Sequence, residues 1–286
     1  MTPPPGPAHE GDAGRGRAVF KWTAMDTAAR CPAELPCTGC PLWGDCGGRA
    51  KRAQGFLPIE DLIAQRRRVS DEQWASEMMC RRPRRSDGVY RRFEVSRHVR
   101  DDPPGGAVGE GTTLVMGMDF GLRSPTVVLW AWAWRVSGFD HVHVVAEHAA
   151  EGWTLEDHLA AMRGVARALA LPEPAWVGVD PAGRQRQSHS GLSDVEVLRS
   201  AGWRVRWRPS RIAAGIEAVR RLIDHDRLTV HPRCVALIRA VQAYRFDPGR
   251  PTCDEPVKDG ADHACDALRY LVVNLDASRP VGVRGY

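Results

Sequence analysis

The amino-acid sequence predicts an α/β domain, a mixed five-stranded sheet flanked by helices, preceded by a small Cys-rich, basic module. Three observations carry this prediction. Strand and helix patterns alternate over residues 113–276, the run Asp-Asp-Pro-Pro-Gly-Gly at 101–106 marks a boundary before them, and four closely spaced cysteines lie further upstream.

Five stretches after the boundary have the composition of β-strands. The first, TLVMGMDFG at 113–121, is apolar and ends in Asp119 and a glycine. The others are PTVVLWAWAWRV, HVHVVAEHAA, AWVGVDPAG and WRVRWRP, at 125–136, 141–150, 175–183 and 203–209. The first three follow one another at hairpin spacing, which predicts an antiparallel meander.

Helical patterns separate and follow the later strands. The helix at 154–170 begins with Thr154 and Asp157 at capping-box spacing. Further helical stretches cover 192–201, 211–225, 232–243 and a closing segment from about 260. The order of elements is three strands, then helix, strand, helix, strand and further helices. This is the order of an RNase H-like layout, in which a hairpin meander leads into parallel strands covered by helices.

The rest of the chain divides by composition. Residues 1–17, rich in Pro and Gly, read as a disordered tail. Residues 18–105 form the Cys-rich knuckle and a helical linker, in which Ser70 is a plausible N-cap with Gln73 three residues later. Residues 111–277 form the RNase H-like domain, and 278–286 are a C-terminal tail.

Composition and charge exclude some classes of protein. The longest apolar run, residues 127–134, falls far short of the ~20 residues that span a bilayer. The first residues contain no apolar segment of a signal peptide, so we expect a reducing compartment and no membrane association. Residues 49–100 contain fourteen Lys and Arg against seven Asp and Glu, within a chain of net charge +5, and this asymmetry favours a polyanionic partner.

Four cysteines have the spacing of a metal knuckle. Cys31, Cys37, Cys40 and Cys46 form the pattern C-x5-C-x2-C-x5-C, with Pro and Gly between them. Four thiolates suit a closed structural zinc site, and an iron–sulfur cluster uses the same ligands. The alternative is that these are buried cysteines without a metal, although the intervening prolines disfavour a helical core segment.

Two groups of arginines are candidates for contacts to nucleic-acid phosphates. The first group lies in the basic linker and comprises Arg81, Arg82, Arg84, Arg85, Arg91 and Arg92. The second, Arg204, Arg206 and Arg208, alternates along one predicted strand with Trp203, Val205 and Trp207, so the arginines share one face. The alternatives are a solvated basic surface and an edge strand protected by charges.

Aspartates lie at the ends of two predicted strands and on the closing helix. Asp119 and Asp180 each follow a strand, and in this layout the two strands are neighbours. On the closing helix Asp259, Asp262 and Asp266 share one face. This face is either a solvated acidic surface with Asp266 paired to Arg269, or part of a carboxylate cluster holding two divalent cations, Mg²⁺ or Mn²⁺. The coincidence of three positions favours the metal site.

The sequence resembles a known family, the C-terminal nuclease region of bacteriophage large terminase subunits with its preceding linker. The resemblance covers roughly residues 18–276. It is carried by FKWTAMDTAARCP, CTGCPLWGDCGGRAK, WASEMMCRRPRRSDGVYRRFE, VMGMDFG, WVGVDPAG and KDGADHACDALRYLV.

The resemblance implies a metal-dependent endonuclease that cuts concatemeric phage DNA during genome packaging in the cytoplasm of the bacterial host. It implies that Asp119, Asp180 and Asp266 are the catalytic acids, assisted by Asp262 and His263. Which of Asp262 and Asp266 is the principal third acid stays open. The implied partners are double-stranded DNA, the terminase ATPase motor, the small terminase subunit and the portal.

One departure from the family is large. Its members normally begin with an ATP-driven motor, whereas no phosphate-binding G-x-x-x-x-G-K-[ST] motif occurs in this sequence. A separately encoded nuclease half, a truncated start and a prophage remnant are all compatible with this. The alternative functions are another RNase H-like nuclease, of the resolvase or recombinase type, and a remnant that binds DNA without cutting it.

Overall fold

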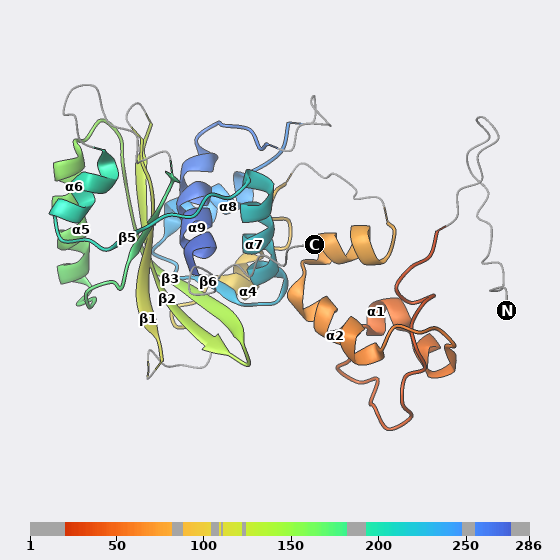
Figure 1. The fold of residues 1–286 in the computed structure, drawn as a ribbon. Helices are drawn as coiled ribbons and strands as arrows, with labels where there is room; N and C mark the ends of the chain where they lie inside the picture. Colours follow the sequence, from red (N-terminus) through yellow and green to blue (C-terminus); the bar gives the residue numbers. More distant parts are fainter. Residues whose placement is uncertain are drawn as a thin grey trace. The chain divides into compact units, whose positions relative to one another are not determined.

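The computed structural model describes residues 21–81, 88–103, 109, 111–121, 124–181, 193–247 and 255–275. The chain forms two compact units, residues 1–85 and 86–286 (Figure 1). None of the helices in the described ranges is long and apolar enough to cross a membrane.

The second unit is built on a six-stranded mixed sheet in the order β5-β4-β1-β2-β3-β6. Its strands are β1 (Thr113–Asp119), β2 (Thr126–Val136), β3 (Phe139–Ala150), β4 (Val177–Val179), β5 (Val205–Arg206) and β6 (Leu228–Val230). The predicted antiparallel meander β1-β2-β3 is confirmed. The predicted number of five strands is wrong, because β6, only three residues long and fully buried, pairs in parallel with β3.

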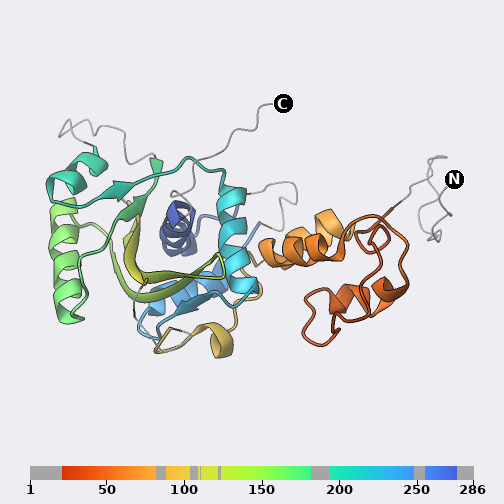
Figure 2. The same ribbon diagram turned by 60° about the horizontal axis from the view of Figure 1, so that its bottom comes forward.

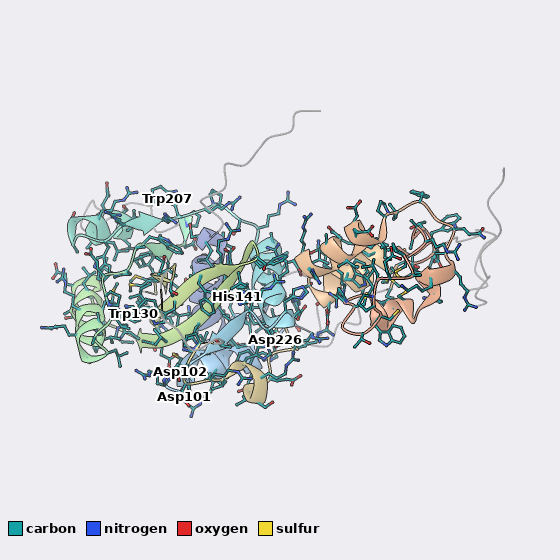
Figure 3. All side chains as sticks on the ribbon, turned by 90° about the horizontal axis from the view of Figure 1, so that it is seen from below. Asp101, Asp102, Trp130, His141, Trp207 and Asp226 are labelled. Atoms are coloured by element: carbon teal, nitrogen blue, oxygen red, sulfur yellow. The ribbon has the colours of Figure 1, made fainter. Side chains whose placement is uncertain are left out.

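Helices cover both faces of this sheet (Figures 1 and 2). On one face α5 (Leu155–Ala168) and α6 (Asp194–Ser200) enclose a cluster that contains Met116, Trp130 and Met162. On the other face lie α7 (Ile212–Asp224), α8 (Val235–Ala243) and α9 (Ala261–Leu275). Figure 3 shows Trp130 inside the first of these layers, where the indole is completely buried. The layering is that of the predicted RNase H-like fold.

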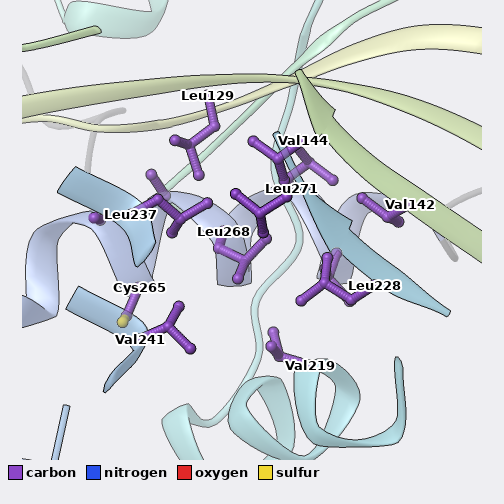
Figure 4. Packing of buried hydrophobic residues seen from close by; sticks show 14 of the residues in the cluster. Leu129, Val142, Val144, Val219, Leu228, Leu237, Val241, Cys265, Leu268 and Leu271 are labelled. Atoms are coloured by element: carbon purple, nitrogen blue, oxygen red, sulfur yellow. The ribbon is translucent and has the colours of Figure 1, made fainter. Parts of the chain in front are cut away.

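Helix α9 lies at the centre of the second layer, in contact with β1, β2 and β4 and with α7 and α8. Leu268 and Leu271 point into the cluster shown in Figure 4. The helix is nevertheless buried on nearly all sides, because Asp262, Arg269 and Tyr270 are also buried. It is a core helix whose polar residues meet other polar residues inside the domain.

Two glycines in the sheet allow α9 to approach so closely. A Cβ on Gly117 of β1 would lie 2.2 Å from the carbonyl oxygen of Ala267, and one on Gly178 of β4 would lie 2.7 Å from that of Tyr270. Any larger residue at either position would push the helix away from the sheet. These contacts fix the height of α9 above the ends of β1 and β4.

The first unit has short helices and a small core of its own. Its elements are α1 (Trp43–Cys46), η1 (Arg49–Arg52), α2 (Ile59–Arg68), α3 (Asp71–Gln73) and η2 (Trp74–Met78), and Leu42, Leu62 and Trp74 lie in its core. The predicted cap is confirmed, since the Gln73 backbone N–H donates to Ser70 Oγ at 3.1 Å.

The segment after residue 85 packs with the second unit. Val89, Tyr90 and Phe93 belong to the core around α9, and the short helix α4 (Val95–His98) follows them. Composition marks residues 101–106 as a boundary, whereas the contacts divide the chain between Arg85 and Ser86. Apolar side chains at 89, 90 and 93 explain the difference, because they are buried by α7, α8 and the sheet.

Candidate active site

The ends of two neighbouring strands bring the first two acids together. β1 and β4 are parallel and adjacent, with Met118 paired to Val179. Asp119 and Asp180 are the next residues on each strand, so both lie at the same edge of the sheet. This confirms the predicted proximity of the two strands, and it places two carboxyl groups where parallel strands commonly end in functional residues.

Helix α9 supplies the remaining polar groups. His263 Nδ1 lies 2.9 Å from Asp119 Oδ2 and links the first turn of the helix to the end of β1. Asp262, 7% exposed, accepts a hydrogen bond from the Gly260 backbone N–H at 2.9 Å. The helix therefore begins directly above the edge where the two strands end.

A buried arginine and a tyrosine connect the other two acids. Arg269 donates from Nε and Nη2 to Asp266 Oδ1, at 3.1 and 3.0 Å. The same Nη2 lies 3.1 Å from the Tyr270 hydroxyl, which donates to Asp180 Oδ2 at 2.7 Å. The ion pair between Asp266 and Arg269 that the solvated-face interpretation expects is present, but Arg269 is 4% exposed, so the pair is inside the domain.

Several of these groups, but neither Asp119 nor His263, border an open cleft of about 560 Å³. Asp180, Asp262 and Asp266 line it, together with two cations that the sequence did not single out, Arg211 and Lys258. The complete lining is Asp180, Pro181, Pro209, Ser210, Arg211, Ile212, Tyr244, Glu255, Pro256, Lys258, Asp262, Asp266, Arg269 and Tyr270. Acids and cations facing one cleft suit a phosphate-containing ligand that binds with divalent cations.

Burial and mutual repulsion disfavour the charged forms of the acids. The pKa of Asp119 is raised to about 6, mainly by burial; the charges of Asp266 and Asp180 act in the same direction, and the hydrogen bond with His263 opposes the rise. Burial also raises the pKa of Asp266, against the effect of Arg269. The Asp119 carboxylate raises the pKa of His263 through their hydrogen bond. An additional cation near these carboxylates would relieve the repulsion.

The acids are held by protein groups in this structure. Within the described ranges, no three His, Cys, Asp or Glu side chains lie close enough together to hold one metal ion as they stand. The carboxyl groups of Asp119, Asp180 and Asp266 instead contact His263, Tyr270 and Arg269. Carboxylate oxygens are nevertheless the ligands that Mg²⁺ and Mn²⁺ prefer, so the donor set fits these ions chemically.

The second group of predicted DNA-contacting arginines has the expected alternation. Trp203, Val205 and Trp207 pack against the cluster around α5 and α6, while Arg204 and Arg206 are exposed. The guanidinium of Arg206 lies 5.0 Å from the centre of the Trp176 ring. Arg208 is half-buried. Contact of these arginines with DNA stays a prediction.

The linker arginines are divided between the two units. Arg82, Arg84 and Arg85 lie outside the described residues. Arg81, in the first unit, forms an ion pair with Asp45 at 2.6 Å. Arg91 and Arg92 are exposed in the second unit, and Arg92 Nε lies 3.9 Å from Asp224. The role of the six residues in DNA binding stays a prediction.

The four cysteines of the first unit all line one cavity of about 210 Å³. Cys31, Cys37, Cys40 and Cys46 are free thiols, and the cavity is also lined by the cation Lys51. They are not close enough together as they stand to form a metal site. The predicted zinc ion and the predicted iron–sulfur cluster both stay predictions.

Sequence reasoning missed Tyr270, Arg211 and Lys258 as members of the site. The sequence places Tyr270 next to Arg269 on α9, and helical spacing puts it one turn after Asp266. The four-residue spacing from Asp266 could therefore have identified Tyr270 as a neighbour of the site. Arg211 and Lys258 reach the cleft from segments far apart in the chain, so their proximity depends on the fold.

No protein-family model matches the chain, and no curated protein matches it. Several solved structures, however, match the chain. The large terminase of a thermophilic bacteriophage in complex with ADP aligns over 83% of this chain and 57% of its own, with TM-score 0.59 and 19% identity. Its complex with ATP-γ-S aligns over 78% of this chain and 56% of its own, with TM-score 0.60 and 19% identity.

The large terminase nuclease domain of phage P22 aligns over 65% of this chain and 91% of its own, with TM-score 0.52 and 17% identity. This chain therefore has the fold of a large terminase nuclease domain, and the predicted structural resemblance is confirmed. It spans a little more than half the length of the complete large terminases that it matches.

Proposed function

We propose that this protein is a metal-dependent endonuclease that cuts phage DNA by two-metal-ion hydrolysis of phosphodiester bonds. One observation supports the proposal: the parallel register of β1 and β4 puts Asp119 and Asp180 at one edge of the sheet, and Asp180 lines an open cleft together with Asp262 and Asp266 of α9. The fold shared with terminase nuclease domains supports it independently.

In this proposal Asp119, Asp180 and Asp266 hold two Mg²⁺ or Mn²⁺ ions, with Asp262 assisting from the same cleft. When bound, the ions activate water and stabilise the charge that develops on the leaving oxygen. His263 orients the carboxyl group of Asp119 through the 2.9 Å contact. Asp262 and Asp266 differ in role, since Asp262 also caps the start of α9 through Gly260.

The biological setting is proposed from the relatives, which are named large terminases. The substrate would then be concatemeric double-stranded phage DNA inside the bacterial host, and the partners would be an ATPase motor, a small terminase subunit and a portal. Complete large terminases are considerably longer than this chain, so these partners belong to the proposal.

The proposal is tested by incubating the purified protein with supercoiled plasmid. With Mg²⁺ or Mn²⁺ we expect nicked and linear products with little sequence preference, and none after chelation with EDTA. Cutting that persists in EDTA, or an absence of cutting with either ion at any concentration of folded protein, contradicts the proposal.

We propose that DNA phosphates bind along the cation-bearing side of the same cleft. Arg211 and Lys258 are exposed and line the same cleft as Asp180 and Asp266, and neither side chain forms an ion pair within the described part of the chain. Cations placed in this way hold a phosphate backbone without reading bases. The arginines predicted from the sequence, those of the linker and Arg204, Arg206 and Arg208, would make phosphate contacts of their own.

Salt dependence of DNA binding checks this assignment. Each lost phosphate contact reduces the log–log slope of affinity against salt by about 0.9. Arg211→Gln with Lys258→Gln should therefore flatten the slope by about two units. Replacing three or four of the linker arginines should flatten it by about three to four. Arg135→Gln, at the far end of the β2–β3 hairpin, is the control and should bind as the parent does; a cleft double variant with the parent's slope would place the DNA elsewhere.

We also propose a structural zinc ion in the first unit, held by Cys31, Cys37, Cys40 and Cys46. The four thiols line one cavity. The Cys40 backbone N–H donates to Cys37 O at 3.2 Å, with Gly39 in the left-handed region at φ 73°. This tight turn is the shape that a C-x2-C ligand pair needs, and thiolates suit zinc.

Elemental analysis should find one zinc per chain, and Cys37→Ser should remove it and lower the melting temperature of the first unit. Cys80→Ser is the matched control, because Cys80 is a free thiol of the same unit outside the cavity lining. A brown protein with absorbance near about 400 nm would assign an iron–sulfur cluster instead. Four thiols that react freely with a thiol reagent in the folded protein would exclude both metals.

A further inference from the structure

We propose that Arg269 and Tyr270 are positioning residues that hold Asp266 and Asp180 in the geometry required to bind the metal ions. This inference rests on the proposed nuclease function and gives a positioning role to two residues in addition to the acids. It concerns a continuous contact path, from Asp266 through Arg269 and Tyr270 to Asp180, that joins helix α9 to the end of β4.

Each contact in the path is short and polar. Arg269 approaches Asp266 with two nitrogens, at 3.1 and 3.0 Å, and its Nη2 lies 3.1 Å from the Tyr270 hydroxyl. That hydroxyl uses its single hydrogen to donate to Asp180 at 2.7 Å. The direction is fixed, since an arginine only donates, and the tyrosine oxygen therefore accepts from Arg269 while it donates to Asp180.

The surrounding structure keeps the path rigid. Arg269 is 4% exposed and Tyr270 is 6% exposed, and the guanidinium lies 4.5 Å from the centre of the Tyr270 ring. Gly215 of α7 leaves room for the arginine stem, because a Cβ there would lie 2.6 Å from Arg269 Cδ. Because packing confines the buried Arg269 side chain, the arginine can fix the orientation of the Asp266 carboxyl group and the Tyr270 hydroxyl.

The charge of Arg269 has a second consequence. Asp266 is repelled by Asp262 and Asp180, and Arg269 offsets that repulsion before any metal ion binds. The same arginine also joins Asp266 to Asp180 through the Tyr270 hydroxyl. Outer contacts of this kind typically change metal affinity or activity by 10- to 100-fold when they are lost.

Tyr270→Phe is the decisive variant, because it keeps the buried ring and removes only the hydroxyl. We expect it to weaken Mn²⁺ binding, measured by calorimetry on the DNA-free protein, by about 10- to 100-fold. The Mn²⁺ concentration for half-maximal plasmid cutting should rise in parallel, while the KM for DNA stays unchanged. Arg269→Lys should act in the same direction, since one ammonium group cannot span both Asp266 and the tyrosine hydroxyl.

Tyr90→Phe is the matched control. Tyr90 is 4% exposed in the same core, and its hydroxyl has no hydrogen-bond partner within the described residues. It should bind Mn²⁺ and cut as the parent does. Circular dichroism and thermal melting of each variant separate a folding defect from a positioning defect.

The outcomes distinguish the two proposals. If the parent protein binds Mn²⁺ and cuts DNA, and Tyr270→Phe does so with unchanged metal affinity, the positioning role is wrong and the nuclease function stands. If the parent neither binds Mn²⁺ nor cuts, the proposed function itself fails. A loss that is equal in Tyr90→Phe and Tyr270→Phe would also overturn the positioning role.

Discussion

Asp119→Asn should reduce DNA cutting by more than about 100-fold and leave the protein folded. Loss of an outer partner of a metal ligand already costs 10- to 100-fold, so loss of a ligand should cost more. The amide keeps the shape of the carboxyl group, and its oxygen can still accept a hydrogen bond from His263. Asp180→Asn should have the same effect. Plasmid cutting in Mn²⁺ measures both.

Stability separates this result from a folding defect. Burial raises the pKa of Asp119 to about 6, above its ordinary value, so the charged form destabilises the folded protein. This destabilisation is absent below the ordinary pKa, grows as pH rises from there to about 6, and is complete above that value. At pH 8 without metal, Asp119→Asn should therefore melt at a higher temperature than the parent. An inactive variant with increased stability cannot be explained by unfolding.

Asp226→Asn is the control for the same chemical change. Asp226 is largely exposed and pairs with Arg97, away from the cleft lining. This variant should cut as fast as the parent. Full activity in Asp119→Asn, or equal losses in Asp119→Asn and Asp226→Asn, would contradict the assignment of the acids.

Gly117→Ala should destabilise the second unit by about 3 kcal/mol, the upper part of the range for overpacked cores. The added Cβ would lie 2.2 Å from Ala267 O and 2.7 Å from Leu271 Cβ, and the first of these is backbone that cannot rotate away. A loss of this size lowers the melting temperature by roughly 6 to 12 °C in a unit of this size. Because α9 would rise from the sheet, Asp266 and His263 would move from the strand ends, and cutting should fall with stability.

Gly164→Ala is the matched control. Gly164 lies inside α5, and a Cβ there would meet nothing within 4 Å. Alanine in an open helical position should stabilise the protein by about 0.5–1 kcal/mol. If Gly117→Ala melted as the control does, the contact between β1 and α9 would not determine the position of the helix.

The sequence predicted the parts of the fold that depend on local pattern. The three antiparallel strands, the parallel pairing of β1 with β4, and the caps at Ser70 and Thr154 are present as expected. Strand-end aspartates could be predicted to meet because parallel neighbours end at one edge. In each of these cases the sequence signal lies within about ten residues or in the order of the strands and helices.

The remaining parts depend on tertiary contacts. β6 is three residues between two helices, too short for a periodic pattern, and it becomes a strand by pairing with β3. Helix α9 reads as amphipathic, yet its polar face is buried because Tyr270 and Arg269 find partners on β4 and on the helix itself. Arg211 and Lys258 reach the cleft from distant segments. Apart from the pair of Asp266 and Arg269, these contacts join residues far apart in the sequence, so no local sequence pattern predicts them.

The most direct test of the metal site is an anomalous difference map from crystals of the protein soaked in Mn²⁺. We expect two peaks roughly 3.5–4 Å apart, between the carboxyl groups of Asp119, Asp180 and Asp266. Both peaks should vanish in Asp119→Asn crystals grown and soaked in the same way. Peaks elsewhere in a protein that cuts DNA, with no peak between these three carboxyl groups, would contradict this site.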